Sequence, residues 1–165
     1  MRVLVISDTH IPIAGDDLPD IIKEEAKKSN YCIHAGDLVS YEVFKKLSSL
    51  TKVYAVCGNM DNSSVINKLP KKYIFKLEDL NVGLIHGVGA PSNLINYINM
   101  EFFKEFDNID LFIFGHSHFP CDKEYKGKIY FNPGSPTDKV YAPYCSYGIL
   151  EIEGKNINRR ILKIE

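Results

Sequence analysis

Five short apolar runs of this chain each end beside a side chain that can bind a metal ion. The first run, Arg2–Ser7, is rich in β-branched residues and lacks helical spacing, which predicts a buried strand. Asp8 and His10 follow it directly. Similar runs occupy residues 31–34, 52–57, 82–85 and 111–114. In open α/β sheets, ligands bind at the carboxyl ends of the strands, so these strand ends predict one common site.

The side chains at these strand ends are two carboxylates, four imidazoles and one amide. They are Asp8, His10, Asp37, Asn59, His86, His116 and His118. Glycine stands next to most of them, at residues 36, 58, 87 and 115. Glycine permits the tight turns and close backbone approach that a crowded sheet edge requires.

This mixture of oxygen and nitrogen ligands, without a thiolate, suits a transition metal better than Ca²⁺. Seven ligands are too many for one open catalytic ion. We therefore expect two divalent cations that share a bridging carboxylate, with Mn²⁺ as first choice and Ni²⁺, Zn²⁺ or Fe²⁺ as alternatives. Two ions about 3.5–4 Å apart can hold both the attacking and the leaving oxygen of an in-line displacement.

Strands and helices alternate through the first two thirds of the chain. We expect a helix over residues 18–28, one that begins after Ser40, a short one over residues 63–68, and a longer one from Ser92 to Phe106. In this last helix Phe102, Phe103 and Phe106 are expected to be core residues. Hairpins are predicted over residues 73–85, 123–131 and 147–164. Without a linker or repeat, residues 1–165 are predicted to form a single domain.

The charge balance argues against a broad nucleic-acid surface. The chain has 20 Lys and Arg against 21 Asp and Glu, for a net charge of −1. No apolar run reaches the length of a membrane span, and Met1 leads straight into a strand-like run, so we expect no signal peptide and a cytoplasmic protein. The four cysteines form no C-x-x-C pair and are expected to be reduced thiols.

The ordered motifs resemble the signature of the calcineurin-like metallophosphoesterases. They are Asp8-Thr9-His10, Gly36-Asp37, Gly58-Asn59, His86-Gly87 and Gly115-His116-Ser117-His118. The resemblance extends to the Asn132-Pro133-Gly134-Ser135 turn, and the length is similar to that of the family's small bacterial and archaeal phosphodiesterases. It implies an α/β fold with a two-sheet β-sandwich flanked by helices in four layers (α/β/β/α). A dinuclear metal site is then expected at the carboxyl ends of the strands.

The resemblance also implies a role for each ligand. Asp8, His10 and His118 would hold the first metal, and Asn59, His86 and His116 the second. Asp37 would bridge the two ions. A metal-bound hydroxide would then attack phosphorus in line, so that Asp37, Asn59 and His86 serve catalysis through the metals. The expected activity is that of a metal-dependent phosphodiesterase acting on small phosphodiesters.

One residue departs from the family pattern. Met60 stands where many members have a histidine that positions the substrate or protonates the leaving group, whereas Asp61, the usual partner of that histidine, is present. Leaving-group protonation is therefore open between Asp61, His34 and water. We expect a preference for diesters or activated esters. Only 26 residues lie between Asn59 and His86, which leaves no room for a cap domain and predicts an open site.

Two other functions fit the same fold. One is a non-catalytic interaction scaffold, such as the retromer subunit that shares it, although the complete ligand set argues against a degenerate site. The other is a nuclease of the same superfamily, which the near-neutral charge disfavours. The expected partner is a small phosphodiester, with neither a membrane nor a nucleic-acid polymer. A homo-oligomer is left open, because Val140–Tyr147 reads either as an aromatic contact surface or, preferably, as an ordinary packed loop.

Overall fold

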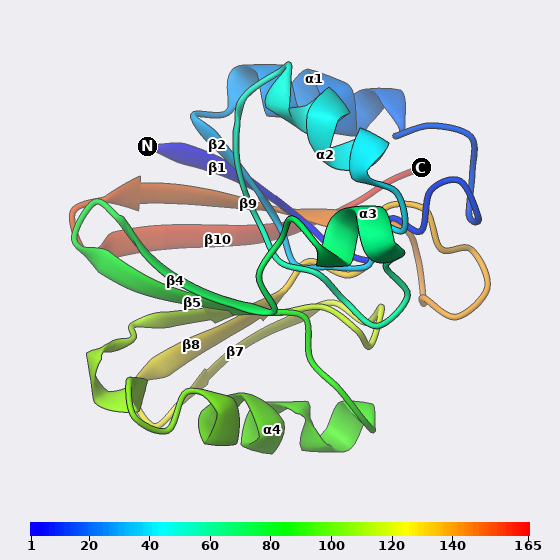
Figure 1. Cartoon of the computed structure of the whole chain (residues 1–165). Coiled ribbons are helices and arrows are strands. Elements are labelled where there is room, and N and C mark those ends of the chain that lie inside the picture. The colour runs from blue at the N-terminus through cyan, green and yellow to red at the C-terminus, as the bar shows by residue number, and fades with distance from the viewer.

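Two five-stranded sheets pack face to face between helices (Figure 1). The structure is a computed structural model that describes residues 1–165. The first sheet holds β1 (Arg2–Ile6), β2 (Tyr31–His34), β3 (Lys52–Ala55), β9 (Ser146–Glu153) and β10 (Asn156–Lys163), in the order β10-β9-β1-β2-β3. The second holds β4 (Lys72–Leu77), β5 (Leu80–Ile85), β6 (Leu111–Ile113), β7 (Cys121–Tyr125) and β8 (Lys128–Asn132), in the order β4-β5-β6-β8-β7.

Helices cover the outer faces of both sheets. They are α1 (Asp20–Lys28), α2 (Tyr41–Ser48), α3 (Ser63–Ile66) and α4 (Leu94–Glu101), with short 3₁₀ turns η1 (Pro91–Asn93) and η2 (Phe106–Asn108). α1 and α2 pack on the first sheet, and α4 packs on the second (Figure 1). This confirms the predicted two-sheet sandwich and its four layers. None of the helices combines the length and apolar character that crossing a membrane requires.

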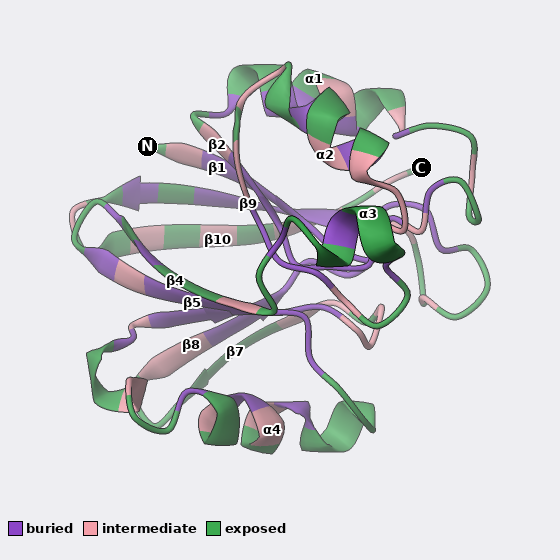
Figure 2. Cartoon of the chain, viewed as in Figure 1, coloured by how far each residue is buried: buried purple, intermediate pink, exposed green.

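Strand β1 is buried on both of its faces. Val3 and Val5 point into the core between the sheets, whereas Leu4 and Ile6 point toward α1 and α2, and all four are fully buried. A strand covered on both sides needs apolar residues at every position, which is why its sequence shows no alternation. Figure 2 shows the same division, with buried central strands and helices that are exposed on their outer faces.

Parallel pairing directs the strand ends toward the site. β1, β2 and β3 are parallel neighbours in the first sheet, and β5, β6 and β8 in the second. The hairpin predicted over residues 123–131 is therefore only part of the pairing in this region. β8 forms the expected hairpin with β7, but on its other side it pairs in parallel with β6. Its carboxyl end consequently joins those of β5 and β6.

Most predicted elements are confirmed, with small shifts at their ends. Ser40 caps α2, because its Oγ accepts a hydrogen bond from the Glu42 N–H at 3.3 Å. α1 begins at Asp20 rather than at Leu18, with Pro19 in the cap position. All four cysteines are free thiols, as expected.

The long helix predicted from Ser92 to Phe106 is confirmed only over Leu94–Glu101, and its predicted ends are wrong. Ser92 lies inside η1 and caps nothing, and α4 ends at Glu101. The chain then tightens into turns in which the Phe103 N–H bonds to the Met100 carbonyl at 3.2 Å. Because the helical period stops there, Phe103 points outward with 80% of its surface exposed, whereas Phe102 is fully buried. The predicted core role of Phe103 is therefore also wrong.

Replacing these two adjacent phenylalanines should have very different effects. Phe102→Ala removes a buried ring from the core between α4 and the second sheet and should lower the free energy of unfolding by about 3–5 kcal/mol. Phe103→Ala should change it by no more than about 0.5 kcal/mol. Urea unfolding followed by circular dichroism measures both. Similar losses for the two variants would contradict the assigned end of α4.

Candidate metal centre

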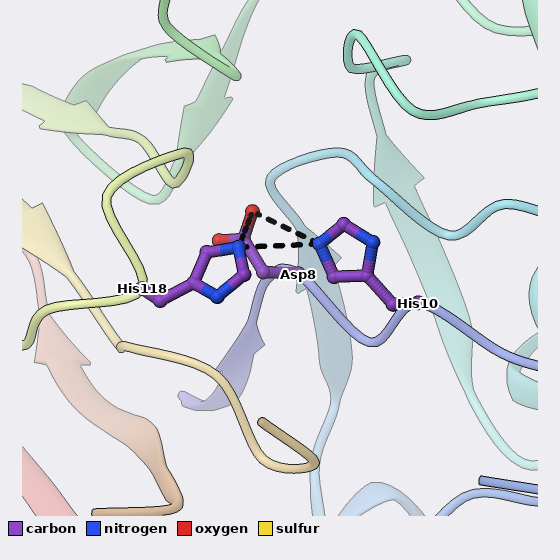
Figure 3. A group of neighbouring side chains, drawn as sticks. All are labelled: Asp8, His10 and His118. Carbon is purple, nitrogen blue, oxygen red and sulfur yellow. Dashed lines mark hydrogen bonds and ion pairs between the residues drawn. The ribbon is translucent and has the colours of Figure 1, made fainter. Parts of the chain in front are cut away.

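Three side chains from the ends of β1 and β6 face one point (Figure 3). Asp8 Oδ1 lies 3.5 Å from His118 Nε2 and 3.9 Å from His10 Nε2, and the two nitrogens are 3.2 Å apart. Ligands with bonds of 2.0–2.1 Å to a tetrahedral ion are separated by about 3.4 Å. The spacing of these three atoms therefore fits the first coordination shell of one divalent cation.

A second group lies beside the first. His86 Nε2 is 3.2 Å from Asp37 Oδ2 and 3.9 Å from Asp8 Oδ1. Asn59 extends this group, because its Oδ1 lies 3.1 Å from His86 Nε2 and 3.0 Å from His116 Nδ1. All seven side chains that the sequence singled out therefore meet at one edge of the sandwich.

Asp37 lies between the two groups. Its Oδ2 is 3.5 Å from His10 Nε2 and 3.2 Å from His86 Nε2, so one oxygen faces both sets of ligands. Its Oδ1 accepts the Met60 N–H at 2.8 Å, which fixes the orientation of the carboxylate. Asp8 also belongs to both groups, a feature that the sequence did not predict. The site thus has two carboxylates at its centre and the imidazoles around them.

Five of the seven candidate ligands have strained backbones. Left-handed φ angles occur at Asp8 (54°), His10 (46°), Asp37 (57°), His116 (69°) and His118 (59°). Only three other non-glycine residues of the chain have a positive φ. Such conformations are costly, and they persist where the surrounding structure enforces them and the strain serves a function.

Two glycines allow the ligand loops to pass close to the carboxylates. A Cβ atom at Gly58 would lie 2.2 Å from Asp37 Oδ1. At Gly115 it would lie 1.8 Å from Ser7 Oγ and 2.7 Å from Asp8 Oδ2. Any side chain at either position would displace the carboxylates, which accounts for the glycines beside the ligands.

The buried carboxylates have no lysine or arginine partner. Their ion-pairing neighbours are imidazoles alone. Burial raises the pKa of Asp8, although nearby His86 and His118 oppose it. Burial also disfavours the charge of Asp37, but its hydrogen bond with His86 keeps the pKa of Asp37 below its usual value. Two buried carboxylates that are surrounded by imidazoles, with no lysine or arginine beside them, suit the binding of divalent cations.

The same two carboxylates also shift the pKa of His86. Burial lowers its pKa, but the hydrogen bond to Asp37 and the charge of Asp8 outweigh burial and raise it to about 9. Its Nδ1–H donates to the Ala35 carbonyl at 2.8 Å, which leaves Nε2 facing the carboxylates. A cation that binds there must therefore displace a proton from Nε2.

Asp138 orients one of the candidate ligands and was missed from the sequence. His118 Nδ1 donates to Asp138 Oδ2, which leaves His118 Nε2 facing Asp8 and His10. The other oxygen of Asp138 accepts the N–H groups of Val140 and Tyr141, at 2.8 and 3.0 Å. Asp138 thereby connects a candidate ligand to the loop that follows.

Asn132 at the end of β8 and the residues that follow it hold the loops of the site through hydrogen bonds. Ser135 Oγ donates to the Asp8 carbonyl at 2.7 Å, and Thr137 Oγ1 donates to the Thr9 carbonyl at 2.8 Å. Asn132 Nδ2 donates to the Gly115 carbonyl at 2.9 Å. One signal could have pointed to this segment: residues 128–131 are another apolar run that ends in polar residues. Because that run was assigned only to a hairpin, its end was left out of the site.

The candidates for leaving-group protonation lie outside the cavity. Asp61 accepts N–H groups from Gly58 and Asp37, at 2.7 and 3.1 Å, and burial raises its pKa. His34 is fully buried, and its Nε2–H donates to Thr9 Oγ1 at 3.0 Å. Burial lowers the pKa of His34 to about 3, so it is neutral at pH 7.

A cavity of about 650 Å³ opens in front of the ligands. Its lining includes His10, Asp37 and His118, and also the side chains of Val140 and Tyr141. These last two are exposed, so the preferred interpretation of Val140–Tyr147 as an ordinary packed loop is wrong at its start. The hydrogen bonds to Asp138 turn the chain there toward the cavity.

Known proteins share the sequence pattern and the fold. Residues 1–155 match the family model described as a calcineurin-like phosphoesterase superfamily domain. A probable metallophosphoesterase of Methanothermobacter thermautotrophicus is 34% identical and covers 99% of this chain and 92% of its own. The NMR structure of a Thermotoga maritima protein has a TM-score of 0.77 at 31% identity, with 99% of each chain covered. For Entamoeba histolytica Vps29 in complex with Zn²⁺ the TM-score is 0.75 at 25% identity, again with 99% of each chain covered.

Removing the support behind His118 should weaken one metal position. Asp138→Ala deletes the hydrogen bond that orients the ring, and Asp138→Asn removes only the charge while an acceptor oxygen remains. We expect metal affinity at the position that includes His118 to fall by roughly 10–100-fold in Asp138→Ala and by less in Asp138→Asn. Calorimetric titration of the apoprotein with Mn²⁺ measures this. Exposed Asp107→Asn is the matched control, and equal effects of Asp107→Asn and Asp138→Ala would contradict the assignment.

Proposed function

Because the chain belongs to the calcineurin-like phosphoesterase superfamily, we propose that it is a metal-dependent phosphodiesterase that hydrolyses small phosphodiesters. The observation that carries this proposal is the position of Asp37 Oδ2 between His10 and His86. A single oxygen that faces two ligand groups suits a bridging carboxylate, and phosphoryl transfer uses such paired cations.

In the proposed site, Asp8, His10 and His118 hold one cation, and Asn59, His86 and His116 hold the other. Two bound cations, with Mn²⁺ as first choice, would lower the pKa of a water molecule that attacks phosphorus in line and neutralise charge on the phosphoryl oxygens. Asn59 contributes a neutral oxygen, which limits the negative charge that an anionic substrate meets.

The remaining residues keep the ligands in place. The Ala35 carbonyl and the Asp138 carboxylate fix the rings of His86 and His118, and the Gly89 carbonyl accepts the Nε2–H of His116 at 3.0 Å. In each case the other ring nitrogen is left toward the site. Such outer contacts set the tautomer and the orientation of metal-binding histidines.

The geometry favours water as the source of the leaving-group proton. Asp61 is engaged by backbone N–H groups and does not line the cavity, and His34 is buried and neutral. Met60, by contrast, lines the cavity and has no proton to give. Asp61 is therefore proposed to position the Gly58 turn, and the enzyme is proposed to favour esters whose leaving groups need no protonation.

A scaffold function is the second candidate, because the fold is shared with Vps29. The complete ligand set counts in favour of catalysis. A nuclease is disfavoured further by the cavity, since no lysine or arginine lines it to bind a polymer backbone. Manganese binding without hydrolysis of any phosphodiester at any pH would favour the scaffold.

A screen of metals against substrates tests the proposed activity. Apoprotein loaded with Mn²⁺ should hydrolyse bis(p-nitrophenyl) phosphate with a kcat/KM at least about tenfold above that for p-nitrophenyl phosphate, which has the same leaving group. Asp37→Ala should reduce hydrolysis to that of buffer with the same metal. A clear preference for the monoester would overturn the proposed diester specificity.

The two histidines of the Gly115–His118 loop should affect different cations. His118→Ala should weaken the position shared with Asp8 and His10, and His116→Ala the position shared with Asn59 and His86. In each variant we expect a loss of more than about 100-fold at one position, because a direct ligand contributes more than an outer contact, and little change at the other. Metal titration of both single variants measures this. Loss of the same position in both would refute the assignment.

A further inference from the structure

Five exposed apolar side chains surround the cavity in front of the candidate ligands. They are Ile13, Met60, Phe119, Val140 and Tyr141, and together they are called the apolar rim. Their exposed fractions run from 49% for Phe119 to 80% for Val140. Single exposed apolar residues are ordinary on protein surfaces, but several around one concave site indicate a ligand.

Three of the five rim residues are held by residues that organise the site. The Met60 N–H donates to Asp37 Oδ1 at 2.8 Å, and the N–H groups of Val140 and Tyr141 donate to Asp138 Oδ1. The ring of Tyr141 stands edge-on to that of His118, with 6.5 Å between their centroids. These three side chains are therefore positioned in a fixed relation to the place where phosphorus would react.

The charged side chains that line the cavity limit which further charged groups the substrate can carry. Neither lysine nor arginine lines it, and its carboxylates are Asp37 and Asp138. Positive charge for a phosphoryl group would come from the bound cations alone. A second phosphate group on the substrate would have no cationic side chain to contact, so a single phosphoryl group fits best.

The size and the lining of the cavity favour a substrate with aromatic ester groups. At about 650 Å³ the cavity lies within the roughly 300–1,000 Å³ range of sites for small molecules. Phe119 and Tyr141 present aromatic rings along it, and aromatic rings stack or meet edge to face with other flat rings. Polar ester groups, such as bare sugars, would leave this lining in contact with water.

We propose that the substrate is a phosphodiester with one phosphoryl group and at least one aromatic ester group that binds the apolar rim. This inference rests on the proposed phosphodiesterase function and adds the chemical class of its substrate. Phe119 and Tyr141 are then the specificity-determining residues, because they contact the ester group and not the reacting atoms.

Binding of phosphinates tests the inference without catalysis. Diphenylphosphinate and dimethylphosphinate are both monoanions with P–C bonds that hydrolysis does not break. Calorimetry on the Mn²⁺-loaded protein should show the diphenyl compound binding at least about tenfold more tightly. Phe119→Ala and Tyr141→Ala should each remove much of this preference and leave dimethylphosphinate unchanged, whereas Tyr141→Phe should retain it. Phe103→Ala, an exposed ring that does not line the cavity, is the matched control.

Kinetics separate this inference from the proposed function. With p-nitrophenol as the constant leaving group, the phenyl diester, whose second ester group is also aromatic, should have a lower KM than the methyl diester, and Phe119→Ala should reduce the difference. Hydrolysis of both diesters with equal KM, together with equal binding of the two phosphinates, would overturn the aromatic specificity alone. Selective binding of diphenylphosphinate without hydrolysis of any diester would refute the phosphodiesterase and retain the ligand class.

Discussion

The buried carboxylate of Asp8 is the contact on which the site depends, because it joins the two sheets at their common edge. It follows β1 in the first sheet, yet both of its oxygens accept the N–H of His116, which follows β6 in the second, at 3.2 and 3.1 Å. The Asp8 carbonyl accepts Ser135 Oγ from the segment after β8. The hydrogen bonds that hold Asp8 in place are therefore also contacts between the two sheets.

The candidate ligands could be predicted from the sequence, whereas the residue that orients His118 could not. Each candidate ligand follows an apolar run within a few residues, so a local pattern reveals it; Asp8 after Arg2–Ser7 is the clearest case. Asp138 lies seven residues beyond the nearest such run, which ends at Phe131. It reaches His118 only because β8 pairs in parallel with β6, and a pairing between distant strands leaves no mark within either strand.

The end of α4 was also predicted incorrectly from the sequence. Phe102 and Phe103 are equally apolar, and helical periodicity treats both as core candidates. What separates them is the end of α4 at Glu101, where the backbone tightens into turns. No glycine or proline marks this end, so only the packing of Phe102 under the second sheet reveals it.

The left-handed backbones of five candidate ligands have a consequence for how such a chain evolves. Asp and His adopt these conformations at a cost that glycine avoids. Selection for metal binding therefore opposes selection for stability at these positions. A descendant freed from catalysis could replace the strained residues and become more stable while it kept both sheets, so the same sandwich would survive the loss of its chemistry.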